Sequence, residues 1–181
     1  VLFRSTALQC LLNTPVLSNR FLAKGYSGEC EFTKEYYSLV YSYWTNKERQ
    51  FEHPGKVLKL LTDRYKQFVP GEPNDVQEVV LCVIDMLEKS LDKEWIQSIF
   101  YGETRTIVNG DKKLAERTEK FACMPLEVGS SYFEQETDVP DFKDDSGKVW
   151  PNVKVRTITS NIGPIFMVSF NLYRQKQAVT V

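Results

Sequence analysis

The sequence has little histidine and no excess of charge of either sign. Its 181 residues include one histidine, His53, and 23 basic side chains are balanced by 24 acidic ones. A single imidazole limits the chemistry that can be proposed, because most general-base and metal-binding schemes depend on histidine. The net charge of −1 provides no basic field, so we expect no direct contact with nucleic acid.

Cysteine is also scarce, and the four cysteines lie far apart at Cys10, Cys30, Cys82 and Cys123. None of them shows the paired spacing of a zinc site, and their separation does not predict a disulfide framework. We therefore expect buried free thiols, and neither a metal nor a cofactor.

Long hydrophobic runs are missing too. No apolar run approaches the roughly 18 residues that cross a bilayer, and the N-terminus lacks a signal-peptide pattern. We expect no membrane partner and an intracellular protein, cytoplasmic or nuclear. With 42% apolar residues the chain can bury one substantial core, which predicts a single domain over residues 1–181.

The clearest positive feature is a predicted helix over residues 74–91. Asn74 is expected to cap it, with Gln77 reaching back to the cap. Asp75, Gln77 and Glu78 crowd its first turn, which by itself is explained as a charged helix start stabilised by the helix dipole. Apolar residues recur at spacings of three and four, and these are Val76, Val80, Val83, Ile84, Leu87 and Leu91.

Shorter helices are predicted around this one, over residues 5–13, 15–25, 33–44, 56–68 and 95–100. In the second helix Val16 is expected to face inward, and Gly25 is expected to end it in a left-handed conformation. Thr33 is the expected cap of the third helix, whose tyrosines we interpret as core and rim. His53 lies at the entry of the fourth helix without a partner that would make it a general base.

After residue 100 the pattern changes to strands. Residues 103–108 alternate and lead into Asn109-Gly110, which predicts a hairpin whose return strand reaches 121–128. The acidic stretch 129–152 is predicted to be a surface loop. Strands are predicted again over 153–158 and 164–173. Helices followed by strands predict an α+β fold.

Several stretches together resemble the catalytic domain of ubiquitin-specific proteases, the papain-like deubiquitinases. Residues 8–15 resemble the helix after the nucleophile, where Leu-Gln-Cys-Leu and Asn-Thr-Pro recur. Residues 74–78 are similar to the Gln-Asp-Ala-(His or Gln)-Glu-Phe box, and 99–104 to the Leu-Phe-x-Gly strand entry. Residues 121–128 and 164–173 resemble the two later strand motifs of the family, in the same order.

The resemblance implies a papain-like fold, with a helical thumb at residues 1–100 and antiparallel fingers and palm at 101–181, incomplete at the C-terminal side. It puts Leu2 in the place of the nucleophilic cysteine, and the histidine box would lie beyond Tyr173. A turn at residues 108–112 replaces the zinc ribbon, which is expected to be lost. Papain-like hydrolysis needs a thiolate, an imidazole and oxyanion donors, so no catalytic residue is expected. Cys10 is expected to be a buried, inert thiol.

The resemblance also implies that Asp75, Gln77 and Glu78 line the cleft for the ubiquitin C-terminal tail. Asp75 would accept hydrogen bonds from tail amides or pair with a tail arginine. We expect a catalytically inactive ubiquitin-binding or scaffolding module, whose partners are ubiquitin or a ubiquitin-like protein and other protein subunits. Two alternatives stay open: a fragment of an active cysteine-type deubiquitinase that hydrolyses ubiquitin C-terminal amide bonds, and a structural subunit of a large assembly such as an RNA-processing machine.

Overall fold

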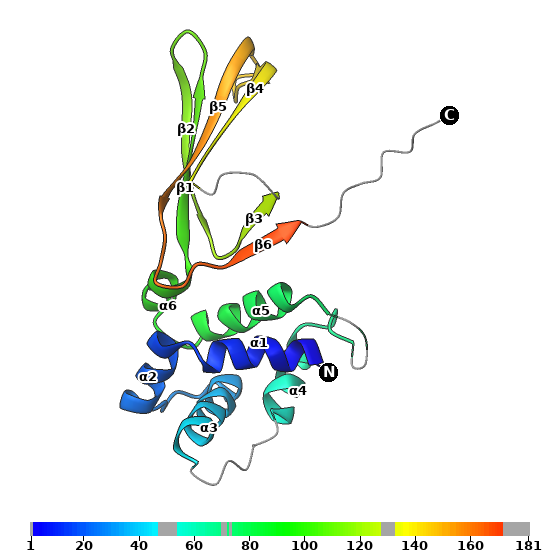
Figure 1. The fold of residues 1–181 in the computed structure, drawn as a ribbon, viewed down its shortest axis with the longest axis vertical. Coiled ribbons are helices and arrows are strands. Elements are labelled where there is room, and N and C mark those ends of the chain that lie inside the picture. The colour runs from blue at the N-terminus through cyan, green and yellow to red at the C-terminus, as the bar shows by residue number, and fades with distance from the viewer. Residues whose placement is uncertain (1, 47–53, 70–71, 73, 128–132, 172–181) are drawn as a thin grey trace, which may run out of the picture. The chain divides into compact units, whose positions relative to one another are not determined.

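Helices occupy the first half of the chain and strands the second (Figure 1). The computed structural model describes residues 2–46, 54–69, 72, 74–127 and 133–171. Its contacts divide the chain into two compact units, Val1–Ile99 and Phe100–Val181. The expected α+β class is confirmed. No helix in the described ranges is both long and apolar enough to cross a membrane.

The helices follow the apolar periodicity of the sequence closely. In chain order they are α1 (Leu2–Leu12), α2 (Pro15–Lys24), α3 (Glu31–Thr45), α4 (Gly55–Arg64), α5 (Val76–Glu88) and α6 (Lys93–Phe100). Side chains buried between them form the core of the first unit, and they include Leu8, Leu17, Phe21, Tyr36, Leu61, Phe68, Val83, Ile84 and Leu87. Gly25 ends α2 with a φ of 64°, as expected for a residue without a Cβ.

Two predicted caps are wrong by one or more residues. Asp75, not Asn74, caps α5, because its carboxylate accepts a hydrogen bond from the Gln77 N–H. The third helix begins at Glu31 after Cys30, and Thr33 lies buried inside its first turn. The Thr33 hydroxyl instead shares a hydrogen bond with Ser90, 57 residues away, which local sequence gives no means of predicting.

Two other helix predictions need correction. The fourth helix ends at Arg64 rather than Phe68, because Tyr65 leaves the helix to hydrogen-bond Asp85 and Phe68 packs into the core. Val16 was expected to face inward, but it is exposed at the start of α2, where Leu17 takes the buried position. His53 lies outside the described residues.

The second unit contains a four-stranded antiparallel sheet in the order β2-β1-β5-β4. Its strands are β1 (Gly102–Asn109), β2 (Lys113–Phe121), β4 (Glu134–Lys143) and β5 (Val149–Asn161). The hairpin predicted at Asn109-Gly110 is confirmed, although its turn extends to Lys112 and the register shifts at Val108 and Asn109. Val153 and Val108 are buried at the middle of the sheet.

The prediction of a surface loop over residues 129–152 is wrong, because β4 and the start of β5 lie within it. Its acidic residues alternate, so Glu134 and Glu136 share one face of β4. There they pair with Arg156 and Lys154 of β5, at 2.5 and 2.7 Å. The acidic residues that suggested a polar loop therefore belong to one face of a strand, and the neighbouring strand supplies the basic residues that pair with them.

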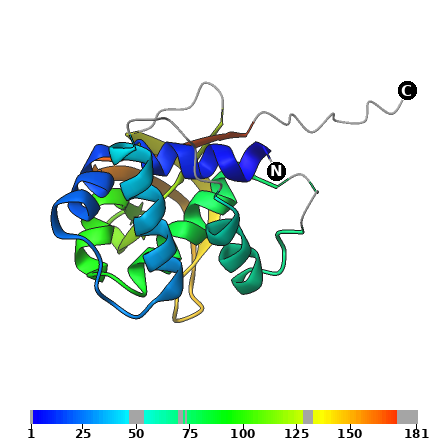
Figure 2. The same ribbon diagram turned by 90° about the horizontal axis from the view of Figure 1, so that it is seen from below.

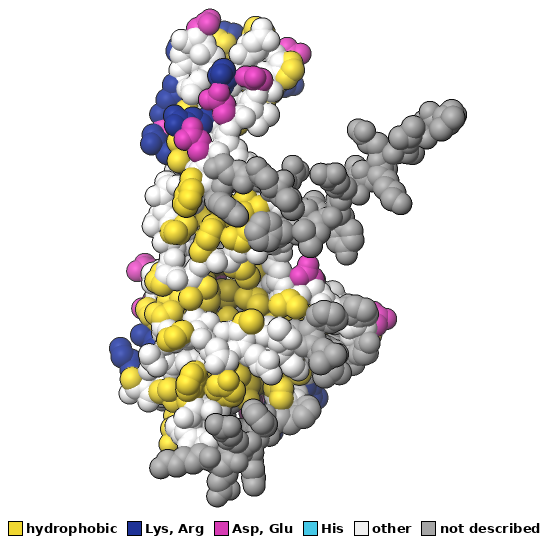
Figure 3. Space-filling view, in the orientation of Figure 1, with side chains coloured by type: hydrophobic (Ala, Val, Ile, Leu, Met, Phe, Trp, Pro, Cys, Tyr) yellow, Lys and Arg dark blue, Asp and Glu magenta, His cyan; other side chains and the backbone are white. Residues whose placement is uncertain are grey.

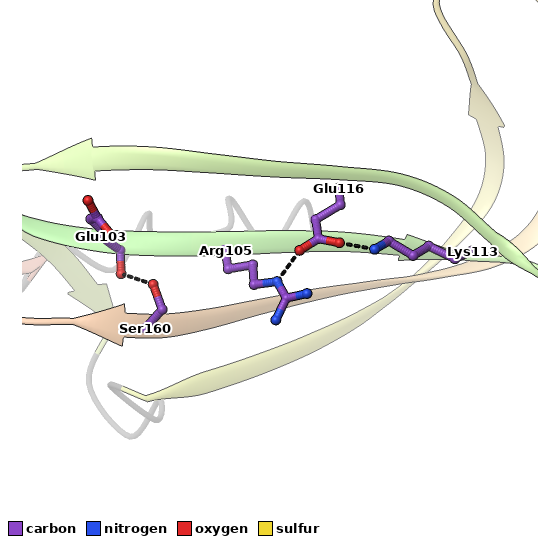
Figure 4. Close-up of polar contacts among 5 residues, drawn as sticks. All are labelled: Glu103, Arg105, Lys113, Glu116 and Ser160. Carbon is purple, nitrogen blue, oxygen red and sulfur yellow. Dashed lines mark hydrogen bonds and ion pairs between the residues drawn. The ribbon is translucent and has the colours of Figure 1, made fainter.

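Charge pairs also connect β1 with β2 in the same sheet. Arg105 of β1 and Lys113 of β2 both point at the Glu116 carboxylate, and Ser160 donates to the Glu103 carbonyl at 3.1 Å (Figure 4). Acidic and basic side chains are intermixed over the end of the sheet that carries its turns (Figure 3). The charges of this sheet are thus largely neutralised within it.

The strands β3 (Met124–Glu127) and β6 (Val168–Asn171) form a separate two-stranded sheet. They are parallel, whereas an antiparallel arrangement was expected throughout. Parallel strands need a long connection between them, and here β4 and β5 lie in that connection. The return strand predicted to reach 121–128 is in fact two strands, β2 and β3, and the strand predicted over 164–173 begins only at Val168. Residues 172–173 lie outside the described part of the chain.

Candidate functional site

The N-terminal turn of α5 carries the three residues predicted to line a cleft. Asp75 is exposed, and its Oδ1 accepts the Gln77 N–H at 2.8 Å. Glu78 is exposed and accepts a hydrogen bond from the Gln67 amide at 3.4 Å, while Gln77 is half-buried. Within the described residues Asp75 Oδ2 has no hydrogen-bond partner, so the acceptor capacity of this carboxylate oxygen is unused.

The start of α1 lies at the same end of the helical unit. α1 packs against α5, and the N-terminal ends of the two helices lie on the same side (Figures 1 and 2). Leu2 is the first residue of α1, and the side chains of residues 1–4 lie outside the described part of the structure. Leu2, which was expected in the nucleophile's place, and the Asp75 cap therefore belong to neighbouring helix starts.

Two adjacent helix N-termini create a partly positive region, because each presents N–H groups without intrahelical partners. The Asp75 side chain satisfies one of these N–H groups in α5. A peptide segment that brought carbonyl groups and a cationic side chain to this region would find donors at the helix starts and an acceptor at Asp75. The arrangement suits binding of an extended chain and provides no acid–base pair among the described side chains.

Cys10 is exposed, so the expectation that it is a buried thiol is wrong. The buried residues of α1 are Ala7, Leu8, Leu11 and Leu12. At 3.6 residues per turn Cys10 lies about 200° around the helix from Leu8, and it therefore faces away from the core. Cys30, Cys82 and Cys123 are thiols outside any disulfide, as expected, but they are half-buried and not fully buried.

Two of these thiols have shifted pKa values. Burial raises the pKa of Cys30, but hydrogen bonds with Thr33, Ser90 and Phe32 outweigh it and leave the pKa below its ordinary value. The pKa of Cys82 is raised, first by burial and then by the charges of Glu78 and Asp85. Neither thiol has an imidazole beside it in the described part of the chain.

Sequence reasoning missed one polar contact near this region. The Tyr65 hydroxyl donates a hydrogen bond to Asp85, which also accepts one from Lys89. Tyr65 falls within the helix predicted over residues 56–68, and the signal that could have revealed the contact is Asp85, a carboxylate one residue after the buried Ile84. No group of three or more metal-ligating side chains is found in the described ranges.

Comparisons with known proteins agree on the kind of domain. The sequence profile described as ubiquitin carboxyl-terminal hydrolase matches residues 3–175. Among solved structures, the SAGA DUB module Ubp8/Sgf11/Sus1/Sgf73 bound to monoubiquitin is similar, with a TM-score of 0.75 and 11% identity. The same module bound to ubiquitin aldehyde matches with a TM-score of 0.72 and 12% identity.

These structural matches cover 93% of this chain but only 45% and 44% of the matched chains. The chain thus spans less than half the length of the proteins that it resembles. At 11–12% identity the likeness establishes a shared fold. A search of curated proteins gives no significant match.

Proposed function

Since this chain belongs to the ubiquitin carboxyl-terminal hydrolase family, we propose that it is a ubiquitin-binding or scaffolding module that does not hydrolyse ubiquitin. The feature that carries the proposal is Leu2, the residue that the spacing from Leu8-Gln9-Cys10 puts in the place of the family's nucleophilic cysteine. An aliphatic side chain cannot form a thiolate, and no other residue of the sequence corresponds to that position.

Binding of the ubiquitin tail is supported by the exposed Asp75 at the start of α5. Its free carboxylate oxygen would accept a hydrogen bond from a tail amide or pair with a tail arginine, and Gln77 and Glu78 support the helix start around it. The solved structures that the chain resembles include modules described as bound to monoubiquitin and to ubiquitin aldehyde, which makes ubiquitin the first partner to test.

Loss of hydrolysis is tested with ubiquitin that carries a fluorophore at its C-terminus. We expect the full-length protein to release no fluorophore above the buffer rate. The exposed Cys10 provides the control, since Cys10→Ser should behave as the wild type does. Release that depends on a cysteine would instead establish the alternative, an active deubiquitinase.

The tail-binding role is tested by two substitutions of Asp75. Asp75→Asn keeps a good helix cap and removes the charge, whereas Asp75→Ala removes both. We expect Asn to leave the free energy of unfolding nearly unchanged but to weaken ubiquitin binding about tenfold or more, as for loss of a charge-assisted hydrogen bond. Ala should also cost about 1 kcal/mol of stability.

Isothermal titration with ubiquitin, and with ubiquitin that lacks its C-terminal tail, provides the measurement. Equal affinity of wild type and Asp75→Asn would remove Asp75 from the binding site. Equal affinity for both forms of ubiquitin would show that the tail is not recognised, and no binding at all would end the ubiquitin-binding proposal.

A second candidate, a structural subunit of an assembly, is favoured by the aromatic end of α3. Tyr41 and Trp44 are 51% and 48% exposed. The Trp44 indole donates to the Leu12 carbonyl at 2.9 Å, and Tyr43 is hydrogen-bonded to Asn13, so these rings are fixed at the surface. Fixed, exposed tryptophan and tyrosine side chains are typical of protein interfaces. Co-purification in fixed stoichiometry that Trp44→Ala abolishes, without ubiquitin binding, would support this function.

A further inference from the structure

The connection between α4 and α5 is attached to α5 at two points. Tyr65, directly after α4, donates a hydrogen bond to Asp85 in the C-terminal half of α5. Gln67 donates to Glu78 in the first turn of α5 at 3.4 Å. Tyr65 precedes Gln67, while Asp85 follows Glu78. Residues 65–67 therefore run antiparallel to α5, toward the N-terminal end of that helix.

Packing and backbone hydrogen bonds hold residues 65–69 of this connection. The Phe68 side chain is 2% exposed, and its ring meets that of Tyr65 at a centroid distance of 6.2 Å. The Phe68 N–H donates to the Tyr65 carbonyl at 3.2 Å, and the Val69 N–H donates to the Gln67 carbonyl at 3.1 Å. Residues 65–69 thus form a compact turn that begins at Tyr65.

The chain continues from this turn toward the Asp75 cap through further contacts. The Glu72 N–H donates to the Val69 carbonyl at 3.3 Å, and the Asn74 amide donates to the Glu72 carbonyl at 2.8 Å. Asp75 follows directly. The direction in which the chain enters the cap therefore depends on where residues 65–69 lie along α5.

The hydrogen bond between Tyr65 and Asp85 is expected to be stronger than the other side-chain hydrogen bonds of this connection. A phenol that donates to a carboxylate forms a charge-assisted bond, and Tyr65 is half-buried. Burial and the Asp85 charge raise the pKa of Tyr65, so the phenol keeps its proton. Lys89 also contacts Asp85, but its side chain is 55% exposed and contributes less.

We propose that Asp85 and Tyr65 form an anchor that positions residues 65–69 along α5 and thereby orients the Asp75 end of the helix for tail binding. Asp85 and Tyr65 are positioning residues, since neither would touch the tail. The role in tail binding rests on the proposed function, whereas the anchoring of residues 65–69 does not.

The anchoring is tested without ubiquitin by hydrogen exchange. We expect Tyr65→Phe to accelerate exchange of the Phe68 and Val69 amides about tenfold, as for loss of one hydrogen bond. Tyr43→Phe is the matched control, because it removes the same hydroxyl from a tyrosine that bonds Asn13 instead. Unchanged exchange at Phe68 and Val69 in Tyr65→Phe would overturn the proposal, whatever the result with ubiquitin.

The effect on binding is tested by a double-mutant cycle. Tyr65→Phe should weaken ubiquitin binding about threefold to tenfold, and Asp85→Asn, which keeps an acceptor oxygen for the phenol, should weaken it less than Asp85→Ala. If Tyr65 acts through Asp75, its effect disappears when Asp75 is already Asn, whereas a general loss of stability would stay additive. Additive effects would overturn the positioning role. Failure of the wild type to bind ubiquitin would overturn the proposed function, and hydrogen exchange would still decide whether the anchor exists.

Discussion

Tyr36 of α3 has a hydroxyl group that the core does not satisfy. Its side chain is fully buried, and among the described residues no partner lies within hydrogen-bond distance of the oxygen. Burial raises the pKa of this phenol, so it stays neutral, and its ring packs against Phe21 and Phe32. The ring thus stabilises the fold by hydrophobic packing, while burial of the unsatisfied oxygen lowers the free energy of unfolding.

We therefore expect Tyr36→Phe to raise the free energy of unfolding by about 1 kcal/mol, because it removes an unsatisfied buried group and keeps the ring. Tyr43→Phe is the control, since the exposed Tyr43 hydroxyl is hydrogen-bonded to Asn13 and its loss should not stabilise the protein. Urea denaturation followed by tryptophan fluorescence measures both. A destabilised Tyr36→Phe would mean that the hydroxyl has a partner in solution, such as a buried water.

The strand β4 forms one edge of the four-stranded sheet, so its outer N–H and C=O groups are open to another strand. Glu134 and Glu136 are engaged with Arg156 and Lys154, whereas Asp138 and Asp141 are exposed, and Pro140 lies between them. Charged residues and proline on an edge strand oppose pairing with a second chain. The acidic stretch thus serves both to bind β5 and to protect the edge.

From this we expect the double substitution Asp138→Thr, Asp141→Thr to promote self-association, which light scattering at rising protein concentration would detect. The matched control is Asp111→Asn, Asp145→Asn, which removes the same charge from turn residues. If both variants self-associate, the cause is the change in net charge and not the loss of aspartates from the edge strand. A monomeric Thr variant would show that Pro140 and the remaining charges protect the edge without these aspartates.

The whole molecule consists of two units with unequal cores. The helical unit buries most of the apolar side chains, while those buried in the described part of the second unit are Phe100, Val108, Met124, Leu126 and Val153. A unit with so small a core is marginally stable alone. We therefore propose that residues 1–181 form one domain, in which the strands depend on the helices for stability.

If the strands depend on the helices in this way, a substitution that destabilises the helical core should destabilise the strands as well. Leu61 is fully buried in α4, and Leu61→Ala should cost about 2–5 kcal/mol. Hydrogen exchange should then accelerate in the strands as well as in the helices, whereas Val16→Ala, at an exposed position, should change neither. Acceleration confined to residues 2–99 would mean that the chain contains two independent domains.

The sequence by itself determined the features that depend on neighbouring residues. Apolar spacing located the helices, alternation and Asn109-Gly110 located the first hairpin, and the order of short motifs identified the family. Of the predicted site residues, Asp75, Gln77 and Glu78 share one helix turn, and their proximity followed from chain order alone.

Only the tertiary structure decided the features in which distant residues meet. It made β4 a strand by supplying Arg156 and Lys154, and it paired β3 with β6 in parallel across 40 residues of intervening chain. It also brought Tyr65 to Asp85. The physical reason is the same in each case, because a strand or a polar side chain takes the conformation that its partner stabilises, and local sequence does not contain that partner.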